Sequence, residues 1–281
     1  MTATSSAIAD TDEAPVKPPA PKTTVLGDAM AQAGEMVQLL GKTIYSAVRH
    51  PRGYWGDVRE QMFLTLKLCW VPMMFACVGF GFGAPGLQAG NIFLLFGIPE
   101  RLGSFFVMAS VREFAPWINA MVVAGVMGTA ITADLGARRI REEIDAMEVL
   151  GLDPFRVLIL PRVIAVTLMT GLMDLVALVF GVIGGYLASL RLGASSAAFQ
   201  QNFFANATTV DLVGSVLKTT LFGLIIGVVC CYKGFRAKGG PAGVGRAVNQ
   251  AVVVSFAAIW SFNFVFTTIL LGLFPEIQVY R

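Results

Sequence analysis

The chain has 281 residues, of which 56% are hydrophobic and 14% are charged, and its mean hydropathy is +0.70. Soluble domains average about 45–50% apolar residues, and the surplus here lies in long runs comparable with the ~20 residues that cross a bilayer. Composition therefore excludes an ordinary soluble protein and predicts an all-α integral membrane protein, while a net charge of only +3 indicates no nucleic-acid partner.

The chain begins with residues 1–27, which contain acidic residues and prolines but no apolar core. This composition is typical of a disordered cytoplasmic tail and not of a signal peptide. Residues 28–281 are predicted to form a single membrane domain. Its first element, residues 28–50, carries Leu40 and Ile44 at helical spacing, and its narrow apolar face favours an amphipathic helix that lies in the membrane interface.

Five apolar stretches follow that are long enough to span a bilayer. Their approximate limits are 62–83, 103–133, 155–190, 211–232 and 247–274. The second and third exceed the length of one crossing, so tilting or a bend near Pro116 is expected. The motifs Gly181-x-x-x-Gly185 and Gly223-x-x-x-Gly227 are typical of close helix contacts, although a chain with thirty glycines also produces them by chance.

Lysine and arginine are distributed unevenly over the segments outside these spans, and cytoplasmic segments carry the excess in membrane proteins. The residues that define the rich side are Lys42, Arg49, Arg52, Arg59, Arg138, Arg139, Arg141, Arg156, Arg162, Lys233, Arg236, Lys238 and Arg246. The residues of the poor side are Arg101, Arg191 and Arg281. We therefore expect a multi-pass protein of the cytoplasmic membrane with its N-terminus in the cytoplasm and its C-terminus outside.

The stretch ARRIREEIDAMEVLGLDP, residues 137–154, places eight charged residues between two apolar spans. Its apolar residues recur at helical spacing and are Ile140, Ile144, Met147 and Leu150. Gly151 and Pro154 are stop signals, so residues 137–152 are predicted to form a short cytoplasmic helix. The other faces of this helix carry Arg138, Arg141, Glu142, Asp145 and Glu148.

The charges of this predicted helix run against its dipole, because the arginines precede the acids. Pairs such as Arg138–Glu142 and Arg141–Asp145 also have the weaker i,i+4 orientation. Two interpretations remain open. The arginines anchor the helix at anionic headgroups while the acids are solvated, or the acidic end docks into a groove of a cytoplasmic partner.

Four ionisable residues lie within or beside the spans, where charges are costly and usually face a cavity or a partner. They are Arg112, Glu113, Asp174 and Lys218. Arg112 and Glu113 are predicted to pair with each other near the outer end of the second span. Lys218 can instead snorkel outward, and Asp174 can be purely structural.

No catalytic set is visible in the sequence. The only histidine, His50, lies in the interfacial region without a nucleophile to activate. Gly41-Lys42-Thr43 resembles the end of a phosphate-binding loop, but Met36 stands where the first glycine is required and no strand precedes it. The four cysteines have no metal-ligand spacing and are predicted to be buried in apolar runs. They are Cys69, Cys77, Cys230 and Cys231.

Several motifs together resemble one family. The stretch TAITADLGARRIREEIDAMEVLGLDPFRVLILPRVIA, residues 129–165, is similar to the signature of the MlaE/YrbE permeases, the membrane subunits of ABC transporters that work with MCE proteins. REFAP (112–116), LKTTLFG (217–223) and CYKGFRAKGGPAGVGRAVNQAVV (231–253) resemble further elements of this family. The resemblance covers residues 35–275 and is greatest to the actinobacterial YrbE subunits of Mce systems.

The resemblance implies a dimeric lipid permease that has no cofactor or catalytic residue of its own. Its expected partners are cytoplasmic ATPase subunits that bind ATP and Mg²⁺, a second YrbE-type permease that makes a heterodimer, MCE proteins outside, and membrane lipids. Residues 137–152 are implied to be the coupling helix that docks into the ATPase. The expected coupling residues are Arg138, Arg141, Glu142, Glu143, Asp145, Met147, Glu148 and Gly151. The candidates for the lipid path are Arg112, Glu113, Lys218 and Asp174.

Two other functions remain compatible with the sequence. An ion-coupled secondary carrier would use the same intramembrane charges, although five unequal spans show no paired repeat. A structural anchor for an extracellular MCE assembly would need no transport. Sterol, fatty acid and phospholipid all fit an apolar cavity with a few charges, so the sequence leaves the lipid open and only favours import.

Overall fold

The computed structural model describes residues 25–49 and 53–278. Most of the predicted tail therefore lies outside the described residues, as does His50. Two units follow each other along the chain: residues 1–35, of which only the first turns of a helix are described, and residues 36–281, which contain every other element. All regular secondary structure in the described ranges is helical.

The first helix, α1 (Val25–Arg49), corresponds to the predicted interfacial helix and begins before it. Two faces can be distinguished within residues 36–49. The buried side chains are Leu39, Thr43 and Ser46. The exposed large apolar side chains are Val37, Ile44, Tyr45 and Val48. The helix therefore buries Leu39 and two hydroxyl side chains against the protein and exposes an apolar face, as expected of a helix that also contacts lipid.

Five helical segments are long and apolar enough to cross a membrane, which confirms the five predicted spans. The first contains α2 (Trp55–Gly81), the π-helix η1 (Phe82–Gln88) and α3 (Ala89–Leu95). The second contains η2 (Pro99–Arg101), α4 (Leu102–Phe106), η3 (Val107–Phe114), α5 (Ala115–Val123), η4 (Ala124–Gly128) and α6 (Thr129–Ile140). The others are η5 (Phe155–Ile159) with α8 (Leu160–Arg191), then α10 (Thr209–Phe235), then α11 (Gly240–Leu273). The first two reach 41 and 42 residues because π-helical stretches join shorter helices end to end.

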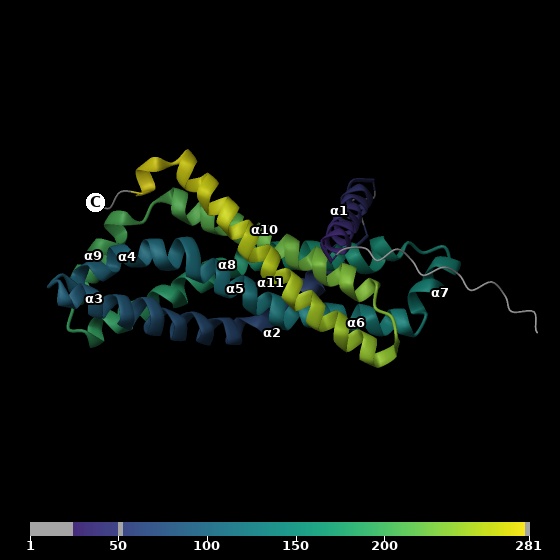
Figure 1. Ribbon diagram of the computed structural model, residues 1–281, viewed down its shortest axis with the longest axis horizontal. Helices are drawn as coiled ribbons and strands as arrows, with labels where there is room; N and C mark the ends of the chain where they lie inside the picture. Colours follow the sequence, from purple (N-terminus) through teal and green to yellow (C-terminus); the bar gives the residue numbers. More distant parts are fainter. Residues whose placement is uncertain (1–24, 50–52, 279–281) are drawn as a thin grey trace, which may run out of the picture. The chain divides into compact units, whose positions relative to one another are not determined.

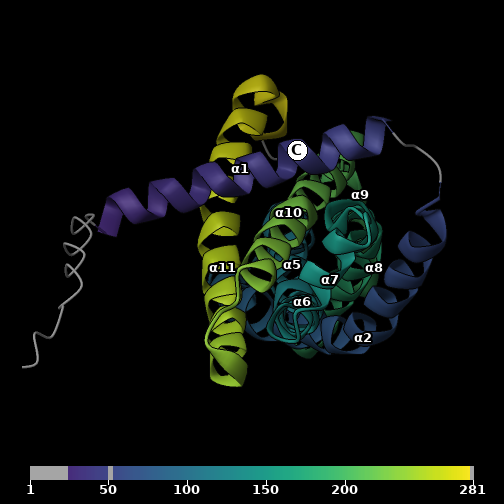
Figure 2. The ribbon, with the colours of Figure 1, turned by 90° about the vertical axis from the view of Figure 1, so that its right-hand side faces the viewer.

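The interior of the bundle is formed by α5, α6, α8 and α10, with α2 and α11 at its flanks (Figures 1 and 2). About half of the most apolar part of each interior segment is buried, against 22% for the first span and 17% for α11. The helix α2 packs mainly on α8, whereas α11 packs on α10 and α6. The two flanking helices therefore present the largest apolar surfaces to lipid.

Glycines allow the helices of the interior to approach closely. A Cβ atom on Gly185 of α8 would lie 2.2 Å from the Phe106 ring, and one on Gly223 of α10 would lie 2.8 Å from the Val166 carbonyl oxygen. Both motifs noted in the sequence therefore mark helix contacts and are not chance spacings. Small residues at such contacts provide the packing that holds membrane helices together.

Replacing Gly223 with alanine is expected to lower the free energy of unfolding by about 1–3 kcal/mol, because the new methyl group meets the backbone of α8 and forces the helices apart. Gly125→Ala is the matched control, since a Cβ at Gly125 meets nothing within 4 Å in the described residues. Thermal unfolding of the purified variants in detergent measures both effects. Equal loss in the two variants would contradict close packing at Gly223.

One helix, α9 (Ser196–Asn206), was not predicted, because its 11 residues are too short to cross a bilayer and have no marked apolar face. It is held to α4 by Phe199, whose ring centre lies 6.1 Å from that of Phe106. Gly103 allows this approach, because a Cβ there would lie 2.2 Å from the Phe199 carbonyl oxygen. The connection between the third and fourth spans is therefore packed structure.

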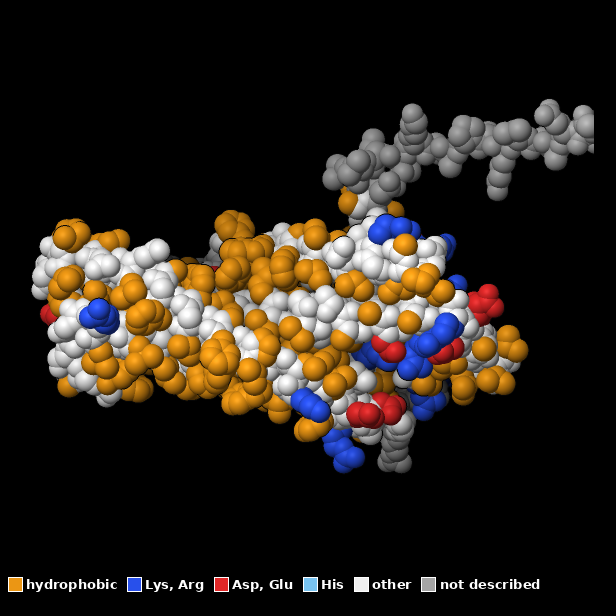
Figure 3. All heavy atoms as spheres, turned by 90° about the horizontal axis from the view of Figure 1, so that it is seen from below, with side chains coloured by type: hydrophobic (Ala, Val, Ile, Leu, Met, Phe, Trp, Pro, Cys, Tyr) orange, Lys and Arg blue, Asp and Glu red, His pale blue; other side chains and the backbone are white. Residues whose placement is uncertain are grey.

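Charged side chains gather at one end of residues 36–281. Figure 3 shows lysine, arginine and acidic groups concentrated at the end that carries α6 and α7 (Glu143–Val149), while the remaining surface in this view is almost uncharged and rich in hydrophobic side chains. The ends of α6 and α10 and the beginnings of α8 and α11 meet there (Figure 1). An apolar belt with basic groups beyond it is the surface expected of a membrane-spanning bundle.

Candidate functional site

An ion pair buried between two spans involves Arg112 of η3. Its Nε donates to Oδ1 of Asp211 at 2.6 Å, and the two side chains are only 10% and 1% exposed. Asp211 also belongs to a capping box at the start of α10, where its Oδ2 accepts the backbone N–H of Thr208 at 3.1 Å. The predicted pairing of Arg112 with Glu113 is therefore wrong, and the true partner comes from another helix.

Glu113 faces α10 and α11 instead. Its carboxylate accepts hydrogen bonds from Asn263 Nδ2 at 2.7 Å and from Thr267 Oγ1 at 2.8 Å, and Lys218 Nζ lies 3.4 Å from it. The Glu113 side chain is 34% exposed, whereas Lys218 is 2% exposed. Lys218 therefore points into the protein and does not snorkel outward. The charge cluster of the spans thus consists of Arg112, Glu113, Asp211, Lys218, Asn263 and Thr267.

Lys218 also contacts the backbone of η3, close to Pro116. Pro116 has no N–H to donate to the carbonyl of Arg112, which lies four residues before it in the helix. Lys218 Nζ donates to this carbonyl oxygen. The same stretch of backbone is π-helical, a form that often marks functional positions within helices. Lys218 thus ties the backbone of η3 and the Glu113 carboxylate to α10.

Asp174 lies elsewhere in the interior, on α8. Its Oδ2 accepts a hydrogen bond from Ser215 of α10 at 2.7 Å, and its Oδ1 has no partner among the described residues. One turn earlier, Asn119 Nδ2 of α5 donates to the Thr170 carbonyl at 2.8 Å. Among the described residues, no hydrogen bond joins Asp174 to the charge cluster, but its carboxylate interacts electrostatically with Lys218. Asp174 therefore joins α8 to α10, and Asn119 joins α5 to α8 one turn away.

The signals for the partners missed by sequence reasoning were present but weak. On α10, Asp211, Ser215 and Lys218 recur at spacings of four and three residues, so they share one helix face. Asn263 and Thr267 do the same on α11. Each spacing marks a polar stripe inside an apolar span, which is the pattern that predicts interhelical hydrogen bonds in membranes.

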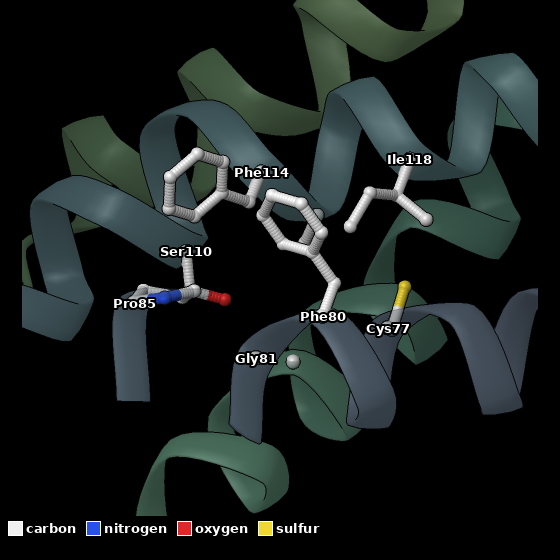
Figure 4. A pocket seen from close by; sticks show the side chains of 9 residues that line it. Cys77, Phe80, Gly81, Pro85, Ser110, Phe114 and Ile118 are labelled. Atoms are coloured by element: carbon white, nitrogen blue, oxygen red, sulfur yellow. The ribbon is translucent and has the colours of Figure 1, made fainter. Parts of the chain in front are cut away.

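The other side of η3 is closed by aromatic packing. Phe114 meets Phe80 of α2 with ring centres 4.9 Å apart, and Ser110 and Cys77 lie beside them (Figure 4). The crevice between these side chains is too small to admit a water molecule. Among the described residues, the accessible polar face of η3 is therefore the one on which Glu113 lies, towards α10 and α11.

At the charged end, the predicted single helix 137–152 is two helices. α6 continues the second span to Ile140, the chain turns at Arg141 and Glu142, and α7 runs from Glu143 to Val149. Glu142 has a φ of 60°, which is unusual for a residue other than glycine. The turn resolves the unfavourable charge order. Arg138 and Arg139 lie in the last turn of α6, and Glu143 and Asp145 lie in the first turn of α7, so each group suits its own helix dipole.

Ion pairs close this turn. Arg138 Nη1 lies 3.6 Å and Arg141 Nε 2.9 Å from the Glu143 carboxylate, and Arg139 donates to Asp145. These pairs differ from the predicted i,i+4 pairs because the helix is broken between them. They are largely solvent-exposed, so each contributes little stability by itself. In the described residues Glu142 and Glu148 form no ion pair, which leaves them available to another molecule.

Some apolar residues of this region pack into the protein, and others are exposed to solvent. Ile144 is fully buried and Met147 packs on the core, whereas Leu150 is 76% exposed. The predicted stop at Gly151 is confirmed, since this residue has a φ of 76° and Leu152 N donates to the Met147 carbonyl at 2.9 Å. We define the α7 tip as Glu142, Glu148, Val149 and Leu150, which together present two acids and two exposed apolar side chains.

The other sequence features considered as a phosphate-binding loop or a metal site do not form one in the described residues. Gly41-Lys42-Thr43 lies inside α1, where the Thr43 hydroxyl donates to the Leu39 carbonyl at 2.8 Å, so it forms no phosphate-binding loop. The four cysteines are free and buried, as predicted. Within the described ranges, no group of three histidine, cysteine or acidic residues is suited to a metal ion.

Residues 59–269 match the family described as Permease MlaE. A probable ABC transporter permease protein of Rickettsia typhi is 30% identical over 241 residues, which cover 85% of this chain and 93% of the relative. A probable ABC transporter permease protein of Synechocystis is 35% identical over 179 residues, 63% of this chain and 68% of the relative. The chloroplastic protein TRIGALACTOSYLDIACYLGLYCEROL 1 of Arabidopsis thaliana is 30% identical over 240 residues, 84% of this chain and 67% of the relative.

Proposed function

Because this chain belongs to the MlaE permease family, we propose that it is the membrane subunit of an ABC-type lipid transporter that imports hydrophobic lipids. A separate ATPase supplies the energy, binding ATP and Mg²⁺ in its own chain. MCE proteins receive or deliver the lipid on the other side of the membrane. Sterol, fatty acid and phospholipid are the candidate cargoes.

The observation that carries the lipid proposal is the charge cluster of the spans. Charged groups within a membrane bundle usually mark a substrate pathway or a partner. The Glu113 carboxylate is the most exposed charge of the cluster and lies between η3, α10 and α11. A polar lipid headgroup can contact it there while the apolar tail follows the neighbouring side chains. The name of the Arabidopsis relative contains that of a glycolipid, trigalactosyldiacylglycerol, which supports a lipid cargo.

The arrangement of charges supports a position for each partner. Basic residues concentrate at the end with α6 and α7, so we assign this end to the cytoplasm, with the N-terminus inside and the C-terminus outside. The ATPase contacts the α7 tip at this end. The exposed face of α11 and the partly exposed Glu113 beside it suit a second YrbE-type permease, which completes the lipid path between two subunits.

The variant Lys218→Met tests whether the charge cluster of the spans is part of the lipid path. It removes the cation that joins Glu113 to the Arg112 carbonyl, and loss of one hydrogen bond to a charged group predicts a drop of about 10- to 100-fold in ATP-dependent lipid transport. The assay is transfer of fluorescent lipid by the complete complex in liposomes. Lys67→Met is the matched control, because Lys67 is an exposed lysine of another span.

The same assay separates the other two functions. Transport that continues without ATP or the ATPase would indicate an ion-coupled carrier. Lipid flux that is unchanged by Lys218→Met and also by Glu113→Gln would favour a structural anchor, because neither the pathway nor its charges would then be used.

A further inference from the structure

A pocket of about 320 Å³ opens between α1 and the beginning of η5, and it contains no residue of the charge cluster of the spans. It is lined by Lys42, Tyr45, Ser46, Arg49, Asp153 and Phe155. The four residues from α1 recur at spacings of three and four, so they lie on adjoining parts of one helix face. The other two lead directly into the third span.

The lining is electropositive. Lys42 Nζ lies 5.2 Å from the centre of the Phe155 ring, and Arg49 Nη1 donates to the Tyr45 hydroxyl at 2.8 Å. Neither cation has a carboxylate partner among the described residues. The one acid of the lining, Asp153, accepts the backbone N–H of Phe155 through Oδ1 at 3.0 Å. Two cations therefore face one acid that is already engaged, and the pocket favours an anion.

The surroundings of the pocket determine which anion suits it. Tyr45 of the lining and Val48 one turn after it are 63% and 76% exposed, so an apolar strip borders the basic groups on one side. A soluble anion leaves this apolar surface in water. An anionic phospholipid covers both, because its phosphate meets the cations while its acyl chains lie along the apolar side chains.

We propose that this pocket binds the phosphate of an anionic phospholipid from the leaflet at the charged end. Lys42 and Arg49 contact the phosphate, and the hydroxyl groups of Ser46 and Tyr45 are within the same lining to donate hydrogen bonds. The bound lipid holds α1 against the segment that follows the α7 tip. This site goes beyond the proposed function, because it uses none of the residues assigned to transport.

The test uses the full chain in detergent, with unfolding temperature measured as phosphatidylglycerol, phosphatidylcholine or inorganic phosphate is added. Phosphatidylglycerol is expected to stabilise the wild type more than the other two. The double variant Lys42→Gln, Arg49→Gln is expected to bind it about 30-fold less tightly, since each basic residue near an anionic surface contributes roughly fivefold. Asp153→Asn keeps the bond to Phe155 but removes the opposing charge, and is expected to increase affinity several-fold.

Two further variants make the result specific. Lys42→Arg, Arg49→Lys keeps both charges and should retain the preference for phosphatidylglycerol. Arg59→Gln, Lys238→Gln removes two exposed basic residues of the same end outside the pocket, and should retain it as well. The proposal is overturned if this control loses as much affinity as the pocket variant, if the pocket variant keeps the wild-type preference, or if inorganic phosphate alone stabilises as strongly as the lipid.

Discussion

Replacing Arg112 with leucine is expected to lower the free energy of unfolding by about 3–5 kcal/mol, the usual effect of removing one partner from a buried ion pair. The loss arises at Asp211, whose carboxylate is 1% exposed and has Arg112 as its only cationic partner among the described residues. The bonds of Asp211 to Thr208 remain, but they do not balance its charge. Unfolding of purified protein by denaturant in mixed micelles measures the change.

A second variant distinguishes an unpaired charge from lost packing. Arg112→Leu combined with Asp211→Asn removes both charges, and asparagine still accepts the Thr208 N–H and so keeps the helix cap. We expect this double variant to recover most of the stability. Arg191→Leu is the control, because Arg191 is exposed at the end of α8 and its loss should change stability by less than about 0.5 kcal/mol. A double variant as unstable as the single one would show that the ion pair is not the cause.

The spans were predictable because a bilayer imposes a length on them. About twenty apolar residues must cross the hydrocarbon core, and this requirement alone finds all five segments. Their ends were not predictable in the same way. The first and second spans extend past the predicted apolar runs because helix continues through η1 and α3 in the first and to the end of α6 in the second.

The partners of the charges were harder to predict than their positions. Arg112 and Glu113 are adjacent in sequence, but neighbours on a helix do not face each other, so each meets a different helix. The polar stripe of α10 indicates that Asp211 and Lys218 bond to another helix, but only the tertiary packing of η3 on α10 determines which residues they meet. The T-x-x-D motif at 208–211 was readable as a helix start, and recognising it would have identified Asp211 as a structural acid.

The turn at Glu142 was not predictable from the periodicity of the sequence. Periodicity over residues 137–152 is helical on both sides of the turn, and glutamate gives no sign of a left-handed conformation. The charge order was the one local indication. Arginines followed by acids are unfavourable for the dipole of a single helix. The same order is favourable where one helix ends and another begins, so this sequence is better suited to two helices than to one.

Replacing Leu150 with aspartate and Glu148 with lysine is expected to weaken binding of the ATPase about 100-fold or more. Leu150 is 76% exposed at the α7 tip, and burying a charged aspartate in place of this apolar side chain at the centre of an interface costs about 2 kcal/mol or more. Glu148 is an acid without an ion pair in the described part of the chain, so its reversal replaces attraction with repulsion towards a basic groove. Copurification and titration of the ATPase against the permease in nanodiscs measure the loss.

The acids of the turn should behave differently from the acids of the tip. Glu143→Lys and Asp145→Lys break pairs with Arg138, Arg139 and Arg141, so they act first on the angle between α6 and α7. Leu95→Asp is the matched control for the tip, because Leu95 is 87% exposed at the end of α3, a helix remote from α7 in Figure 1. It should leave ATPase binding unchanged. Wild-type copurification and ATP-dependent transport in the tip variant would exclude α7 as the contact through which ATP hydrolysis acts on the spans.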